Sequence, residues 1–256
     1  MHFALHLPHN TLGLRYLADK ANLDNGGLVM SATTMEHSLT IAELKADHEV
    51  SVYLTRSTEY LGNLGFTEHG LRHAGIVSAL AYKVLQELEY PPRDCELAAI
   101  AGYLHDIANM INRYNHGGSG AIMAFNILTR MKMPPEEVAL VISAIGNHED
   151  ERGNAVNHVA AALILADKSD VHRARVTNRD FAKFEIHDRV NYAAESSKLL
   201  IDLSSRTITL AVTIDTKICP VMEYFEIFLL RMVMCRRAAE FLNCRFKLVI
   251  NDYDLL

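Results

Sequence analysis

The sequence has no basic run, no closely spaced cysteine pair and no long apolar stretch, and each absence narrows the class of protein. The net charge is −6 at pH 7, so without a cluster of Lys or Arg we expect no binding to a nucleic-acid polymer. The four cysteines form no CxxC pair, which favours reduced thiols and a cytoplasmic location over a disulfide framework. No run of about 18 apolar residues occurs, so no membrane span is expected. The start, MHFALHLPHN, lacks the basic and apolar regions of a signal peptide.

The chain is long enough to bury one large core and to carry an appendage. It has 256 residues, half of them hydrophobic. Apolar residues recur mostly at helical spacing, which predicts a mainly α fold: a helical bundle with a small C-terminal α/β (ββαβ) appendage. The expected parts are an N-terminal extension over residues 1–46, a helical domain over 47–185 and the ββαβ subdomain over 186–256. We expect no catalytic cluster in that subdomain.

Two of the predicted helices carry histidine on an apolar face. Thr67 is the expected N-cap of the first, whose apolar stripe includes His73, with His69 one turn earlier on the same helix. Residues 97–109 predict a second, buried helix with His105 and Asp106 in its latter half. A buried carboxylate without a partner is costly, so Asp106 must be neutral, paired or metal-bound.

Three more polar side chains lie at the ends or on the apolar faces of predicted helices. His116 falls in a glycine-rich loop over residues 114–120, and His148 follows a helix end. Asp167 projects from the apolar face of a helix that Asn157 caps, while Lys168 and Asp170 read as a solvated pair on the other side. Each of these residues alone is more often an ordinary core or helix-end residue.

Together, the histidines and aspartates form a set of metal-ligand types on successive helices. The set is His69, His73, His105, Asp106, His116, His148 and Asp167. Imidazole and carboxylate without thiolate suit divalent Fe, Mn, Co, Ni or Zn. Seven candidates exceed the four ligands of a structural zinc site and suit two metals in a helical bundle.

The pattern H73…H105-D106…D167 resembles the signature of the HD-domain metal-dependent phosphohydrolase superfamily, over roughly residues 47–175. The added His116 and His148 are similar to the multi-metal branch that includes the HD-GYP phosphodiesterases. Asn109 stands where HD-GYP proteins have lysine, and their GYP residues are absent after Glu149, which argues against a cyclic dinucleotide substrate.

The resemblance implies hydrolysis of a small phosphoester, such as a nucleotide, by a metal-activated hydroxide at a dinuclear site. It implies that His73, His105, Asp106 and Asp167 are core ligands, that His116 and His148 hold a second metal, and that His69 is a further ligand. Asp106 is the candidate bridging ligand and, with His105, the catalytic residue. Candidates for phosphate contact are Arg72, Asn109, Arg113, Lys168 and Arg152.

Two other functions remain open from the sequence. Some HD-fold proteins with a similar ligand set are di-iron oxygenases, and the loss of the lysine and GYP residues also allows a regulatory module that binds metal or nucleotide without turnover. A core of structural His–Asp pairs without metal is the least specific alternative. The mostly apolar segment EYFEIFLLRMVMC offers a homodimer face or simply covers the predicted hairpin.

Overall fold

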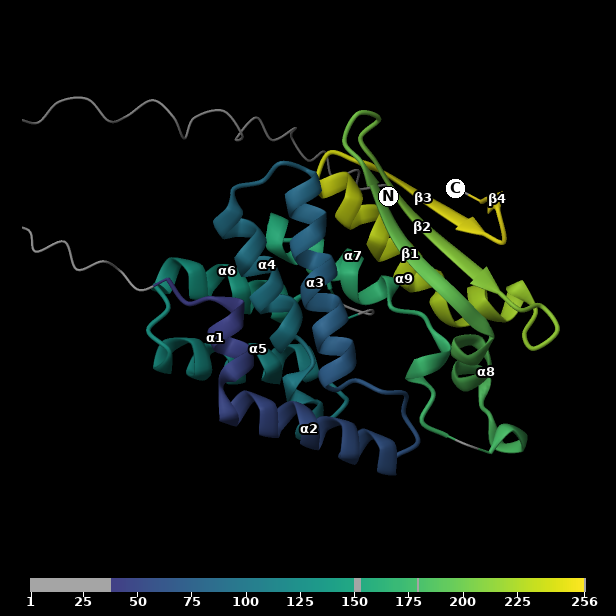
Figure 1. Cartoon of the computed structure of the whole chain (residues 1–256), viewed down its shortest axis with the longest axis horizontal. Coiled ribbons are helices and arrows are strands. Elements are labelled where there is room, and N and C mark those ends of the chain that lie inside the picture. Colours follow the sequence, from purple (N-terminus) through teal and green to yellow (C-terminus); the bar gives the residue numbers. More distant parts are fainter. Residues whose placement is uncertain (1–37, 150–152, 179, 256) are drawn as a thin grey trace, which may run out of the picture. The chain divides into compact units, whose positions relative to one another are not determined.

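A helical bundle and a small C-terminal sheet make up the computed structural model, which describes residues 38–149, 153–178 and 180–255 (Figure 1). The α-helices are α1 (Ile41–Ala46), α2 (His48–Asn63), α3 (Leu71–Glu87), α4 (Pro92–Leu104), α5 (His116–Arg130), α6 (Pro135–Gly146), α7 (His158–Ser169), α8 (Ile186–Ala193) and α9 (Val221–Phe241). Short 3₁₀ helices are η1 (Ile107–Met110), η2 (Arg173–Arg175) and η3 (Phe181–Lys183). The strands are β1 (Ala194–Asp202), β2 (Thr207–Ile214), β3 (Arg245–Ile250) and β4 (Tyr253–Asp254). The predicted fold class, mainly α with a C-terminal α/β appendage, is confirmed.

Side-chain caps start several helices at the residues that local sequence indicates. Asp47 accepts a hydrogen bond from the Val50 amide at 3.1 Å, and Asn157 accepts one from the Ala160 amide at 2.7 Å. Thr40 and Glu43 form a reciprocal capping box at the start of α1. This helix lies within the range predicted as an extension, and its Leu44 is buried in the core. The rest of that range, residues 1–37, lies outside the described residues, as does Arg152.

The bundle is built around the buried helix α4, which packs against α3, α6 and α7. Every residue of α4 from Leu97 to Leu104 is buried, as the apolar run predicts. Gly102 lies where the backbones of α3 and α4 approach most closely: a Cβ there would stand 2.9 Å from the Cα of Ser78 and from the carbonyl oxygen of Val77. The missing side chain therefore sets the spacing between the two helices.

Three helix boundaries differ from the sequence predictions. Thr67 does not cap α3, because that helix begins only at Leu71, after Gly70. Helix α5 begins at His116, inside the predicted glycine-rich loop, after Asn115 adopts a left-handed conformation at φ 57°. Helix α7 ends at Ser169, earlier than the apolar run suggested.

The C-terminal part forms a four-stranded sheet in the order β1-β2-β3-β4. Strands β1 and β2 are an antiparallel hairpin, with Leu199 opposite Leu210, and β3 pairs in parallel with β2, with Leu210 opposite Leu248. The crossover between the parallel strands is α9, which contacts both β3 and α7 of the bundle (Figure 1). The sequence predicted these elements but missed the short antiparallel β4.

Helix α9 also has an uncovered apolar side, on which Met222, Leu229 and Leu230 are exposed. The homodimer stays a prediction for this side. Among the described residues, no helix combines the length and the apolar character needed to cross a bilayer.

Replacing Gly102 with alanine is expected to lower the free energy of unfolding by about 1–3 kcal/mol, because the added methyl group meets backbone atoms that no rotamer change can move. Urea denaturation measures the change. Gly75→Ala in α3 is the matched control: no atom lies within 4 Å of its Cβ position, and it should gain about 0.5–1 kcal/mol of stability. Destabilisation of similar size in both variants would contradict the close-approach role of Gly102.

Candidate metal centre

His105 and Asp106 lie where α4 ends rather than inside a continuing helix. The α-helix stops at Leu104, His105 is its C-cap, and Asp106 has φ −99° and ψ 7° before η1 begins. The prediction that the helix continues through both residues is wrong. Because the helix ends here, the side chains of His105 and Asp106 point toward one place. In a regular helix, two successive side chains would point about 100° apart.

His69 reaches the same point from a loop, not from the first turn of α3 as predicted. The Glu68 amide donates to the Arg175 carbonyl at 2.7 Å, and the Glu68 carboxylate accepts from the Gly70 amide at 2.7 Å. These bonds hold the segment before α3 in a non-helical conformation. The ring centroids of His69 and His73 are nonetheless 5.6 Å apart.

All five imidazoles of the predicted set are anchored through Nδ1. The acceptors are the carbonyls of Thr67 (for His69, 2.6 Å), Gly102 (for His105, 2.9 Å), Arg113 (for His116, 2.9 Å) and Ile145 (for His148, 2.6 Å), and the carboxylate of Asp170 (for His73, 2.7 Å). A carbonyl or carboxylate oxygen only accepts, so Nδ1 carries a hydrogen in each ring and Nε2 is the atom that presents a lone pair when the ring is neutral. Such anchoring is typical of histidines that ligate a metal.

The carboxylate of Asp106, which is 2% exposed, turns one oxygen to each of two histidine pairs. Its Oδ2 lies 3.3 Å from Nε2 of His105 and 3.6 Å from Nε2 of His73. Its Oδ1 lies 3.2 Å from Nε2 of His116 and 3.9 Å from Nε2 of His148. One carboxylate thus borders two separate groups of ligand atoms.

Within each pair the Nε2 atoms face one another closely. They are 3.2 Å apart in His73 and His105, and 3.1 Å apart in His116 and His148. Lone pairs at this separation repel unless a proton or a cation lies between them. Oδ1 of Asp167 adds a negative charge 3.2 Å from Nε2 of His73. The donor atoms therefore fit bound cations, and the groups His73–His105–Asp167 and His105–Asp106–His148 can each hold a metal ion.

The protonation of these groups reflects the balance between burial and charge. Burial alone lowers the pKa of His105, but the carboxylates of Asp106 and Asp167 raise it to about 10. Burial lowers the pKa of His69 and His148 well below the ordinary value, and neighbouring positive charge adds to the effect. Without a metal, His105 therefore carries the compensating positive charge, while His69 and His148 keep neutral lone-pair donors.

Lys168 and Asp170 are both buried, so their prediction as a solvated pair is wrong. The Lys168 ammonium lies 2.7 Å from Oδ2 of Asp167, which leaves Oδ1 of that carboxylate turned to the histidines. Asp170 accepts from Nδ1 of His73 and is itself held by Arg72 at 3.1 Å. The two residues thus position ligands from the end of α7.

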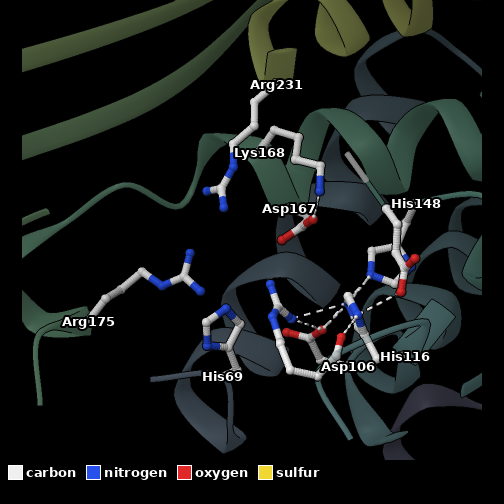
Figure 2. A pocket seen from close by; sticks show the side chains of 10 residues that line it. His69, Asp106, His116, His148, Asp167, Lys168, Arg175 and Arg231 are labelled. Atoms are coloured by element: carbon white, nitrogen blue, oxygen red, sulfur yellow. Dashed lines mark hydrogen bonds and ion pairs between the residues drawn. The ribbon is translucent and has the colours of Figure 1, made fainter. Parts of the chain in front are cut away.

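A small cavity of about 30 Å³ lies against these ligand atoms. Its lining residues are His69, Asp106, Arg113, His116, His148, Glu149, Asp167, Lys168, Arg175 and Arg231. Figure 2 shows Arg231 extending from α9 toward Asp167 and Lys168, while Arg175 enters beside His69. The cavity therefore brings guanidinium groups next to carboxylates and imidazoles, an arrangement that suits an anion next to bound cations.

The residues predicted to contact phosphate divide into two groups. Arg113 and Lys168 line the cavity, and Arg113 lies 3.6 Å from Oδ1 of Asp106. Arg72 and Asn109 do not line it: Arg72 engages Glu68 and Asp170, and Asn109 accepts a hydrogen bond from Arg113 at 3.2 Å.

Sequence reasoning missed Asp170, Arg175 and Arg231. Asp170 follows Asp167 by three residues, and its position beside a buried stripe was the available signal. Arg231 is the single charged residue in the apolar segment FLLRMVM of α9, where a charged residue is unusual, so it too was detectable. Arg175 carried no such signal, because only the fold brings it to the loop before α3.

No protein-family model and no curated protein matches this chain. Among solved structures, the chain is similar to a predicted HD superfamily hydrolase from an uncultured Thermotogales bacterium, with 21% sequence identity and a TM-score of 0.41. The alignment covers 60% of this chain and 89% of that chain.

Replacing Asp170 with asparagine is expected to weaken metal binding by about 10- to 100-fold, because His73 loses the carboxylate that orients its ring. Isothermal titration of metal-depleted protein with Mn²⁺ or Zn²⁺ measures the change. Asp94→Asn is the matched control, since Asp94 pairs with His158 at 3.2 Å outside the cavity lining. Equal affinities of the two variants would show that Asp170 does not support a ligand.

Metal affinity is also expected to rise with pH. The carboxylates raise the pKa of His105, so at neutral pH a cation must displace the proton on Nε2. With one proton released per cation, the apparent dissociation constant should fall about tenfold per unit between roughly pH 6 and pH 8. Titrations in buffers of different ionisation enthalpy count the released protons. An affinity independent of pH in this range would contradict the displacement of a proton from His105.

Proposed function

We propose that this protein is a metal-dependent phosphohydrolase that cleaves a small phosphoester at a centre holding two divalent transition metals. The observation that carries the proposal is the carboxylate of Asp106, with one oxygen toward His73 and His105 and the other toward His116 and His148. A shared carboxylate between two imidazole groups is a recurrent arrangement for dinuclear centres in helical bundles.

The residues that would hold the two cations follow from this geometry. His73, His105, Asp106 and Asp167 would hold one, and Asp106, His116 and His148 the other, with His69 as a further ligand at the cavity wall. The donor set contains imidazole and carboxylate but no thiolate, which suits Fe, Mn, Co, Ni or Zn. When bound, such a pair of cations lowers the pKa of coordinated water toward neutrality and offsets charge on phosphate oxygens.

The surrounding side chains support an anionic substrate. Arg113, Arg175 and Arg231 line the cavity, and guanidinium groups bind phosphate oxygens in paired hydrogen bonds. This local positive charge offsets the net charge of −6 over the whole chain. Lys168 neutralises the outer oxygen of Asp167, so the carboxylates repel an incoming phosphate less.

The charges of two other polar residues at the cavity, His69 and Glu149, are either absent or already paired. Burial keeps His69 neutral, so its ring gives the cavity wall no charge of its own. Glu149 also lines the cavity, but its carboxylate lies 2.7 Å from Nδ1 of His116 and accepts a hydrogen bond from the Gly117 amide at 2.7 Å, so two groups already engage its charge. The arginines are thus the groups that orient the phosphate and stabilise the charge it develops.

Protein purified without a metal-affinity tag is expected to contain about two equivalents of transition metal and to hydrolyse phosphoesters from a panel of nucleotides and sugar phosphates. Asp106→Ala should retain less than one equivalent and lose at least about a hundredfold in kcat/KM, because both ligand groups lose a member. Elemental analysis and phosphate release measure the two quantities.

The control variant His158→Ala should keep both metal and activity, because His158 pairs with Asp94 and does not line the cavity. Full metal content in Asp106→Ala would contradict the shared ligand. Oxygen uptake coupled to turnover would contradict hydrolysis and indicate an HD-fold di-iron oxygenase. Ligand binding without any product would indicate a regulatory module instead.

A further inference from the structure

A second, larger cavity adjoins the metal centre. Its volume is about 610 Å³, within the range of small-molecule binding sites. Four residues, His69, Arg113, Arg175 and Arg231, line both this outer chamber and the small cavity at the ligand atoms. A molecule whose phosphate lies among the three arginines can therefore extend its organic group into the outer chamber.

Part of the wall of the outer chamber comes from α8 and the residue before it. Glu185, His187, Asp188 and Asn191 all line the chamber. Asp188 and Asn191 are 6% and 5% exposed, so water reaches them poorly. Residues three apart on a helix lie on one face, which places the two side chains next to each other.

Asn191 has a buried acceptor atom without a donor. Its Nδ2 donates to the His187 carbonyl at 2.9 Å, but its Oδ1 has no hydrogen-bond partner among the described residues. A buried acceptor left unpaired costs about 1–3 kcal/mol, and most such atoms in folded proteins have a partner. An acceptor of this kind in the wall of a chamber points to a hydrogen-bond donor on a ligand.

The chamber wall thus combines two chemistries. The residues shared with the cavity at the metal centre include three guanidinium groups, and the α8 residues include a carboxylate and an amide oxygen, which accept hydrogen bonds. Phe66 and Phe228 contribute apolar surface to the wall of the chamber. The guanidinium group of Arg231 lies 4.6 Å from the ring centroid of Phe228. The complementary ligand is an anion with hydroxyl or amino donors on a partly apolar body.

We propose that Asp188 and Asn191 are specificity-determining residues that accept hydrogen bonds from hydroxyl or amino groups of the ester's organic part. The inference rests on the proposed phosphohydrolase function for the position of the phosphate. It assigns the choice among phosphoesters to the C-terminal part of the chain, in which the sequence predicted no catalytic cluster.

The test compares adenosine 5′-monophosphate and glucose 6-phosphate, which carry donors, with phenyl phosphate, which carries none beyond its phosphate. Wild-type protein should prefer the first two in kcat/KM and in Kd measured by calorimetry. Asn191→Leu should reduce the preference for at least one donor-bearing ester about tenfold, mainly through KM. Asn191→Asp, which keeps an acceptor oxygen, should restore much of it, and Asp188→Leu should act in the same direction as Asn191→Leu.

Asn126→Leu is the matched control, because Asn126 makes the same bond to the carbonyl four residues earlier, at 3.0 Å, on an exposed face of α5. It should leave the preference unchanged. Unaltered preference in both Asn191→Leu and Asp188→Leu, or equal binding of all three esters by the wild type, overturns the proposal. Discrimination in Kd without hydrolysis would support the proposal while refuting the phosphohydrolase function, so the two failures are distinguishable.

Discussion

The site depends on one shared carboxylate. Asp106 is almost fully buried, and its charge is tolerable there because imidazoles surround both of its oxygens. Those imidazoles are in turn fixed at Nδ1, so their lone pairs point at the carboxylate and at one another. Removing any member leaves the remaining ones with unbalanced charge in a low-dielectric interior. The cluster is stable as a set, and a bound cation is the group that balances it best.

Two of the candidate ligands reach the site from places where regular helical structure ends or has not yet begun. Helix α4 ends just before His105, and a bonded loop instead of a helical turn presents His69. Between these two points, Gly102 lets α3 and α4 approach closely enough for His73 and His105 to meet. The regular helices keep the backbone rigid, and the helix ends and loops set the direction in which His105 and His69 point.

The candidate ligands His73, His105, Asp106 and Asp167 could be predicted from the sequence because each is a polar residue in an apolar run, and burial of such a residue demands a partner. His116 and His148 were included as a loop histidine and a helix-end histidine. The fold class followed from periodicity. The path of His69 could not be predicted: Thr67 is a good local cap, but the bonds of Glu68 to Arg175 and Gly70 outweigh it, and Arg175 lies far along the chain. The prediction of a solvated pair at Lys168 and Asp170 was wrong for the same reason, because only the tertiary structure buries both residues and brings Asp170 to His73.

The candidate ligands and the part of the outer chamber wall formed by α8 and α9 come from different stretches of the chain. All seven donors precede Lys168, whereas Arg231 and the α8 wall come from the C-terminal part that holds the sheet. Substitutions in α8 and α9 that reshape the chamber therefore need not touch a candidate ligand. Under the proposed function, the range of esters accepted can change by substitutions confined to α8 and α9 while the metal centre is retained.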